Sequence, residues 1–483
     1  MTGRRTREAL VGDPKGLLDR VEKSTCGPKS KALLREFVAT ESTGAIAFAA
    51  YDVPPVLVRA KGATLWDADG KSYIDMIASF SVANIGQTNA AVVAAIREQS
   101  EELIHCFDLP NQPRTALARR LLDLTPGEHE KRVAFGVTGS DATEVAMRMA
   151  RWYTGAPMIL SAYAGYHGMT AATIAASGRG RAWAYYYPTG PHDSGHAKIP
   201  YPYPYRCPFG SSDPEECASR CVEFLRMLLS SSTSPLGGGK GDICNVAAVL
   251  VEPMQAAGGY IIPPPSFLKG LRELCDEFGI LLILDEIQTG LGRTGKLWGC
   301  DHSGVVPDIM AIGKSLGGGM PISAVVARSE IAASWGPGAH LSTFAATPLA
   351  SAAANAALDY LVDNRLPELA ATTGAYLKDL LLELSASHAL IGSVDSCGLF
   401  TGIEFVRDRE TKEPASEEAA WMLDFCKTEG LLLQRGGPFG NRFMLIPPLV
   451  ISKDEIDEAV AILGRALQAV TSAREPTSAL VQR

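Results

Sequence analysis

Short apolar runs that stop at a charged residue recur through the middle of the chain. The runs at 247–251 and 280–284 contain only Ala, Val, Leu and Ile, and they stop at Glu252 and Asp285. Uninterrupted apolar runs of this length are typical of parallel strands that are buried on both faces. Because α/β proteins bind ligands at the carboxyl ends of such strands, the pattern predicts an α/β fold with a ligand site beside these carboxylates.

Lys314 lies between two further apolar runs, at 308–312 and 322–327, and a glycine-rich bend follows it. Burial among apolar residues would lower the pKa of the lysine and provide the neutral amine that Schiff-base chemistry needs. Taken alone, a surface lysine in a loop is the more common meaning of this pattern. A phosphate-binding P-loop is excluded, because Asp308 stands where that motif requires glycine.

A buried anion such as Asp285 could keep a pyridine nitrogen protonated. The protonated ring is the electron sink of pyridoxal phosphate (PLP). The following residues also contain Gly290-x-Gly292-x-x-Gly295, formally a dinucleotide-binding pattern. We reject that interpretation, because five residues separate the strand from the first glycine and no regular helix follows.

An anion site is predicted where the strand at 131–137 passes through Thr138, Gly139 and Ser140 into a helix. The free N–H groups of a first helical turn bind anions, so Gly139 and Ser140 are candidate phosphate binders. An ordinary helix cap, in which Ser140 or Asp141 satisfies its own helix, explains the same residues equally well.

The stretches LDEIQTGLGRTG and PDIMAIGKSLGGGMP resemble the active-site signature of class III aminotransferases, the ω-aminotransferase and acetylornithine aminotransferase group of fold-type-I PLP enzymes. The resemblance extends from about residue 65 to about residue 451. It implies a large domain with a mostly parallel sheet and a smaller α+β domain built from both termini. The expected parts are an N-terminal segment with part of the small domain (1–105), a large PLP-binding domain (106–346) and a C-terminal small domain (347–483).

The resemblance implies a cofactor site made of Gly139, Ser140, Tyr166, His167, Glu252, Asp285, Gln288, Lys314 and Thr343. Lys314 would carry PLP as a Schiff base and later shuttle a proton. Asp285 would hold the ring nitrogen protonated, and Gln288 would bond the phenolic oxygen of the ring. Tyr166 would stack on the ring, although an isolated Tyr-His-Gly is more often core packing or loop. Thr343 would reach the cofactor phosphate of the partner in a homodimer.

Two departures from the family pattern concern the substrate. Ala257 stands where relatives carry a glutamate, and Met444 stands where many of them carry an arginine that binds the substrate carboxylate. Arg442 lies on the same face of the predicted strand and could substitute. The sequence therefore predicts ping-pong transfer of an amino group from a neutral or polyhydroxylated amine, such as an amino sugar, or from a diamine. Racemisation or epimerisation of an amino acid or amino sugar is the alternative.

Composition adds several expectations. The chain has 483 residues with 46% hydrophobic content, enough for one large core and one smaller core. The net charge of −8 argues against nucleic acid as a partner, and no apolar segment is long enough to span a membrane. Ten cysteines without a CxxC pair predict reduced thiols in a cytoplasmic enzyme, and no metal site is expected.

Two segments lack a chemical role in this scheme. Residues 21–42 are expected to form one amphipathic helix. Residues 179–241, rich in Tyr, Pro, Gly and Ser, are expected to be irregular, and their tyrosine-rich part either borders the substrate entrance or packs on the surface.

Overall fold

The computed structural model describes residues 13–42, 50–178, 195–234, 236 and 245–472. Its largest sheet has seven strands in the order β4-β10-β9-β8-β7-β5-β6. Their bounds are β4 Lys131–Gly136, β5 Met158–Ala162, β6 His196–Ile199, β7 Val246–Val251, β8 Leu281–Asp285, β9 Ile309–Ile312 and β10 Ser323–Arg328. Strands β5 to β9 run parallel, and β10 runs antiparallel to both β9 and β4. The predicted mostly parallel α/β sheet is confirmed.

Alternate residues of the central strands enter two separate cores, because successive side chains of a strand point to opposite faces. Leu250 and Ile283 pack with α7 (Gly139–Thr154) on one face. Val249 and Leu282 pack on the other face, where α10 (Pro214–Ser230) and α11 (Pro265–Phe278) lie. Burial on both faces explains why these strands read as continuous apolar runs.

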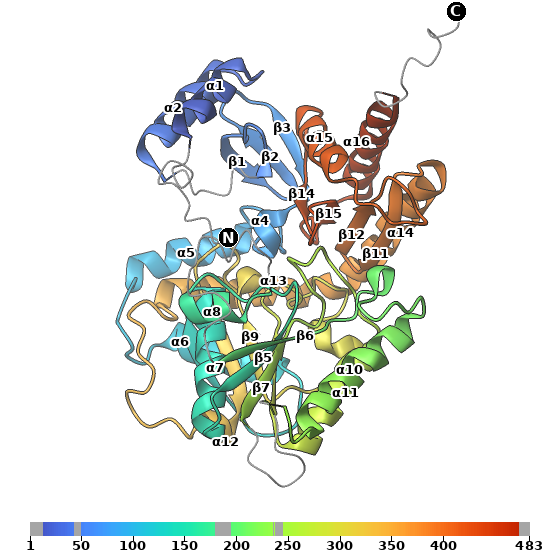
Figure 1. Ribbon diagram of the computed structural model, residues 1–483. Coiled ribbons are helices and arrows are strands. Elements are labelled where there is room, and N and C mark those ends of the chain that lie inside the picture. The colour runs from blue at the N-terminus through green and yellow to red at the C-terminus, as the bar shows by residue number, and fades with distance from the viewer. Residues whose placement is uncertain (1–12, 43–49, 179–194, 235, 237–244, 473–483) are drawn as a thin grey trace, which may run out of the picture.

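Two smaller sheets lie together above the large sheet in Figure 1. The first has the order β1-β2-β3-β13, and the second has the order β11-β12-β15-β14. Their bounds are β1 Leu57–Lys61, β2 Thr64–Asp67, β3 Ser72–Asp75, β11 Ile391–Cys397, β12 Phe400–Phe405, β13 Leu431–Leu432, β14 Gln434–Gly436 and β15 Arg442–Leu445. Since β3 pairs with β13, segments from both ends of the chain share one sheet.

Helices connect and cover these sheets. Besides α1 and α2, which are described below, the remaining α-helices of the described residues are α4 Ala78–Ser81, α5 Ala90–Glu102, α6 Gln112–Leu124, α8 Ala171–Ala176, α12 Ser329–Ala332, α13 Pro348–Asp363, α14 Leu366–Ser387, α15 Ser416–Thr428 and α16 Lys453–Ser472. Helix α13 packs against α5 and α6 and against the short turn that begins at Lys314. Helices α5 and α13 thus lie at the junction between the predicted large and small domains.

Two local expectations were wrong. The segment 21–42 contains parts of two helices, α1 (Pro14–Lys23) and α2 (Pro28–Thr40), because Gly27 and Pro28 begin a new helix. The segment after residue 194 is not irregular, since it contains β6, a 3-10 turn (Pro204–Arg206) and the 17-residue helix α10. Residues 179–194, 235 and 237–244 of that prediction lie outside the described residues. None of the described helices is both long and apolar enough to cross a membrane.

Candidate active site

Lys314 begins a 3-10 turn directly after β9, at the edge of the sheet where the parallel strands end. Its backbone φ is +46°, a left-handed conformation that is unusual for a residue other than glycine and that is concentrated at functional sites. Its Nζ donates to Oε1 of Gln288. Burial lowers the pKa of Lys314 to about 8, although the nearby carboxylates of Asp285 and Glu252 act in the opposite direction.

Asp285 is the last residue of β8, and its carboxylate is almost completely buried. Oδ2 accepts a hydrogen bond from Nδ1 of His167 at 2.8 Å, and Oδ1 accepts one from the N–H of Ile287 at 3.1 Å. His167 Nε2 is buried and has no hydrogen-bond partner among the described residues. Asp285 and His167 therefore form a buried carboxylate–imidazole pair in the site.

The neighbouring carboxylate, Glu286, takes no part in this pair. It accepts hydrogen bonds from the N–H groups of Gly299 at 2.9 Å and Cys300 at 2.8 Å, and from the hydroxyl of Thr289. Adjacent residues at a strand end point in opposite directions, which explains why only Asp285 faces His167.

Glu252 follows β7 and joins two loops of the site. Its Oε1 accepts a hydrogen bond from the N–H of Tyr166 at 3.0 Å, and its Oε2 accepts one from the N–H of Ala256 at 2.8 Å. Burial raises the pKa of Glu252 to about 7, and the charge of Asp285 contributes in the same direction. Through the first of these hydrogen bonds, Glu252 holds the loop that carries Tyr166 and His167.

The N-terminus of α7 lies beside the same loop. Thr138 and Asp141 form a capping box, in which the N–H of Asp141 donates to Oγ1 of Thr138 at 3.2 Å. The first intrahelical hydrogen bond starts at Ala142, so the N–H groups of Gly139 and Ser140 precede the helical ladder and can serve an anion. Oγ of Ser140 accepts from the N–H of Met169 at 3.1 Å, so Ser140 is not the cap of its own helix.

Sequence reasoning missed Tyr260. Its hydroxyl accepts a hydrogen bond from Nε2 of Gln288 at 2.7 Å, while the other end of the same amide faces Lys314. The ring of Tyr260 stacks on Phe400 with centroids 4.0 Å apart. Its place directly after Gly258 and Gly259, in a loop that follows a strand ending in a carboxylate, was the signal available in the sequence.

Thr343 is exposed on the surface of its own chain. Its carbonyl accepts from Nε2 of His105 at 2.8 Å, and the ring of His105 lies 5.1 Å from that of Phe344. Phe344 is 63% exposed. The contact of Thr343 with the cofactor phosphate of a partner chain stays a prediction.

The expected substitute role of Arg442 is wrong, because its guanidinium is fully buried and bonded to the protein itself. The acceptors of its five N–H groups are the carbonyls of Gly259 and Tyr260, the hydroxyl of Tyr203, and the carboxylates of Glu404 and Asp395. No donor of Arg442 is left for a substrate carboxylate. Met444 is buried in an apolar cluster with Phe400 and Tyr260, and Ala257 is half-buried nearby.

The residues at these strand ends fit PLP. The N–H groups at the start of α7 suit its phosphate, the buried Asp285 suits its ring nitrogen, and Lys314 provides an amine with a lowered pKa. Within the described residues, no cluster of His, Cys, Asp or Glu is arranged to hold a metal ion.

Comparison with known proteins agrees with this geometry. The family model "Aminotransferase class-III" matches residues 47–467. The chain is 39% identical to a leucine/methionine racemase of Thermococcus litoralis, over 88% of this chain and 94% of the racemase. It is 36% identical to an acetylornithine aminotransferase of Methanopyrus kandleri, over 86% of this chain and 95% of that enzyme. A solved PLP-bound amine transaminase from an uncultivated Pseudomonas species superimposes with a TM-score of 0.80 at 32% identity, over 89% of this chain and 98% of that one.

A match over most of the chain, relatives that align along nearly their full length, and a site that fits the cofactor lead to one conclusion. The chain belongs to the class III aminotransferases, and it is a pyridoxal 5′-phosphate-dependent aminotransferase of fold type I.

Proposed function

We propose that the enzyme moves an amino group between a primary amine and a keto acid or aldehyde in two successive half-reactions. The observation that carries this proposal is the convergence of Lys314, Asp285 and the N-terminus of α7 at one edge of the sheet. When bound, the cofactor supplies an electron sink for the electron pair that remains when a substrate carbon loses its proton.

The residues of the chain then have separate tasks. Lys314 binds the cofactor covalently, and its Nζ moves the proton between two carbons. Asp285, kept in place by His167, holds a proton on the ring nitrogen. Gly139 and Ser140 bind the phosphate through their N–H groups.

Three other residues orient the ring. Gln288 bonds its phenolic oxygen, and Tyr166 stacks on its face. Glu252 keeps Tyr166 in position through the hydrogen bond to its N–H.

We further propose that the substrate carries an apolar group. The place where an arginine was expected is filled by Met444, in a cluster with Met254, Phe400 and Ile446 that reaches the site through Tyr260. These side chains are buried and apolar, and they offer the hydroxyl groups of an amino sugar, or the second ammonium of a diamine, no hydrogen-bonding partner. An apolar amine or amino acid suits it better than either.

Racemisation at Cα of an apolar amino acid is the second candidate reaction. The specific observation in its favour is the match to a protein named leucine/methionine racemase, together with the apolar cluster around Met444. Both reactions start with removal of the same proton, and they differ in the carbon to which Lys314 returns it.

A homodimer completes the proposal. Exposed apolar side chains gather around Thr343, from the segment after α5 and from the loop before α13: Leu103, Ile104, Phe107, Leu341 and Phe344. Contiguous exposed apolar patches mark interaction sites, and a second copy of the chain would bring Thr343 to the partner's cofactor phosphate.

The first prediction concerns Lys314. Because its pKa is lowered to about 8, the amine is protonated and unreactive below that pH and becomes a nucleophile above it. The rate at which cofactor-free protein attaches PLP can be monitored by visible absorption. This rate should rise with pH, and the midpoint of the pH profile should lie near 8. The Lys314→Ala variant should show no band. A midpoint near the ordinary lysine value of 10.5 would show that the amine is not desolvated.

Asp285 and Glu286 provide a matched pair of variants. Asp285→Asn removes the charge that holds the ring nitrogen protonated, so turnover should fall by roughly 10²–10³. Glu286→Gln alters a carboxylate whose hydrogen-bond partners among the described residues are Thr289, Gly299 and Cys300, so it should lower thermal stability and leave the folded enzyme active. Steady-state rates with saturating PLP test whether Asp285 is the partner of the ring nitrogen. The assignment is wrong if Glu286→Gln loses more turnover than Asp285→Asn.

The substrate proposal predicts faster reaction with apolar amines and amino acids than with amino sugars or diamines. Each compound should be incubated with a keto acid acceptor, and both the new carbonyl product and the inverted amine should be measured by chiral chromatography. A preference for hydroxylated or dicationic amines contradicts the apolar assignment. Inversion without any new carbonyl product favours the racemase reaction.

Phe344→Asp should weaken the dimer, because it places a charge in the centre of the apolar patch. The matched control is Leu382→Asp, an exposed leucine on α14 outside that patch. Light scattering should report a dimer for wild type and for the control, and a larger monomer fraction for Phe344→Asp. A monomeric wild type with tightly bound PLP would exclude the role of Thr343.

A further inference from the structure

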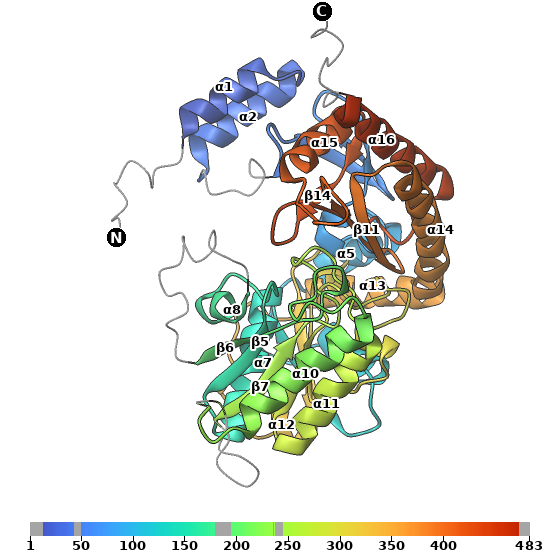
Figure 2. The same ribbon diagram turned by 45° about the vertical axis from the view of Figure 1, so that its right-hand side comes forward.

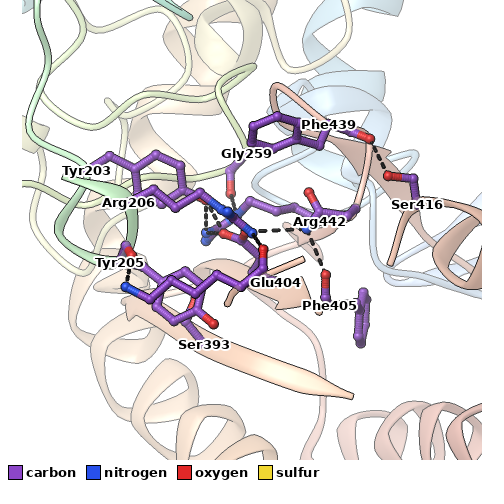
Figure 3. A network of polar contacts seen from close by, with 12 residues as sticks. Tyr203, Tyr205, Arg206, Gly259, Ser393, Glu404, Phe405, Ser416, Phe439 and Arg442 are labelled. Atoms are coloured by element: carbon purple, nitrogen blue, oxygen red, sulfur yellow. Dashed lines mark hydrogen bonds and ion pairs between the residues drawn. The ribbon is translucent and has the colours of Figure 1, made fainter. Parts of the chain in front are cut away.

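Glu404 is a buried carboxylate of the small domain that is surrounded by donors (Figure 3). It stands opposite Arg442 in the ladder between β12 and β15, and its Oε2 accepts from Nη1 of that arginine at 2.8 Å. Its Oε1 accepts from Nε of Arg206 at 2.5 Å, and the hydroxyl of Tyr203 also donates to Oε2. Burial acts to raise the pKa of Glu404, but these partners outweigh it and hold the pKa below its usual value. Glu404 is therefore ionised.

Tyr203 and Arg206 come from the segment that leaves the last strand of the large sheet. Nη2 of Arg206 also donates to the carbonyl of Lys412 at 2.5 Å, and Nζ of Lys412 returns a hydrogen bond to the carbonyl of Tyr205 at 2.8 Å. The large domain is thus fastened to the small domain around one buried carboxylate (Figure 3).

Arg442 extends this connection to the loop after β7. Its Nε donates to the carbonyl of Gly259 at 2.6 Å, and Nη2 lies 3.5 Å from the carbonyl of Tyr260. Glycine is required at 259, where φ is +110° and a Cβ atom would come within 2.5 Å of Cδ of Arg442. Tyr260 itself has a left-handed φ of +59°, so the contacts of Arg442 and the stacking on Phe400 hold a strained backbone in place.

Tyr260 in turn supports one orientation of the Gln288 amide. The ammonium of Lys314 has donors and no acceptor, so the amide oxygen of Gln288 must face it. The amide nitrogen then faces Tyr260, whose hydroxyl accepts from it at 2.7 Å. Without that acceptor, Lys314 is the one remaining hydrogen-bond partner among the described residues that holds the amide of Gln288 in this orientation.

We propose that Glu404, Arg442 and Tyr260 are positioning residues that couple the seating of the small domain to the orientation of Gln288 and thereby to the amine of Lys314. The inference rests on the proposed role of Lys314 and deepens it. None of the three residues needs to touch the substrate. When the small domain is in the position seen in the structure, Oε1 of Gln288 accepts a hydrogen bond from Lys314. When the small domain is displaced, the Gln288 amide rotates and Lys314 loses this acceptor.

The effect can be measured on the lysine itself. The charged groups that face Lys314 are Asp285 at the end of β8, Glu252 after β7 and Arg293 in the loop after β8. These stay unchanged when Tyr260 or Glu404 is altered. A hydrogen bond to the ammonium favours the charged form, so loss of the Gln288 contact should lower the pH at which Lys314 becomes a nucleophile.

The experiment measures the pH midpoint of PLP attachment to the cofactor-free full-length protein. Tyr260→Phe removes the acceptor for Gln288, and Glu404→Gln removes the negative charge of the network together with one of its acceptor oxygens. Both midpoints should fall by about half a unit to one unit relative to wild type, the size expected for one hydrogen bond. Tyr205→Phe is the matched control, because its hydroxyl is buried in the same segment and has no hydrogen-bond partner among the described residues. Its midpoint should equal that of wild type.

Unchanged midpoints in both variants overturn the proposal, and a shift in Tyr260→Phe alone overturns its interdomain part. If Glu404→Gln does not fold, Tyr203→Phe replaces it, because this variant keeps every charge and removes one donor to Glu404. An unchanged midpoint in Tyr203→Phe is then interpreted in the same way as an unchanged midpoint in Glu404→Gln. A wild type that attaches no PLP at any pH would instead refute the proposed function.

Discussion

Asp285 carries a carboxylate that the fold has removed from water, and such a group is tolerated only beside compensating partners. The Nδ1 atom of His167 and the N–H of Ile287 supply hydrogen bonds, and the amine of Lys314 lies close enough to be influenced by its charge. The site keeps a second buried carboxylate, Glu252, whose pKa is raised to about 7. Burial thus gives Glu252 and Lys314, in the same small volume, proton affinities that they would not have in water.

The sheet explains how these groups meet. Strands β7 and β8 are parallel neighbours, so Glu252 and Asp285 leave the sheet at the same edge, and Lys314 follows the next strand, β9. Outside this edge, Arg442 of β15 holds the loop that carries Tyr260 through the carbonyls of Gly259 and Tyr260. The residues proposed to bind the cofactor therefore lie at the edge of the large sheet, and the proposed orientation of Gln288 depends on contacts of Arg442 on β15.

The strand-end residues could be predicted from sequence because each of them directly follows its own apolar run. Lys314, Asp285 and the capped start of α7 depend on local order, and the structure brings them together. The role of Arg442 could not be predicted in this way. Gly259 and Tyr203 accept hydrogen bonds from its guanidinium, and they lie 183 and 239 residues away along the chain. A local sequence pattern cannot indicate such distant contacts. The N-terminal helices were misjudged for a different reason, because amphipathic spacing continued past the break at Gly27 and Pro28.

The central claim is that the amine of Lys314 is the group that holds the cofactor. Borohydride reduction of PLP-loaded enzyme, followed by digestion and mass spectrometry, tests it directly, because reduction makes the lysine linkage permanent. The predicted result is a single modified peptide that contains Lys314, and no label on Lys198, a half-buried lysine whose pKa burial lowers to about 7. Label on Lys198 or another lysine, or no label at all, would contradict the account.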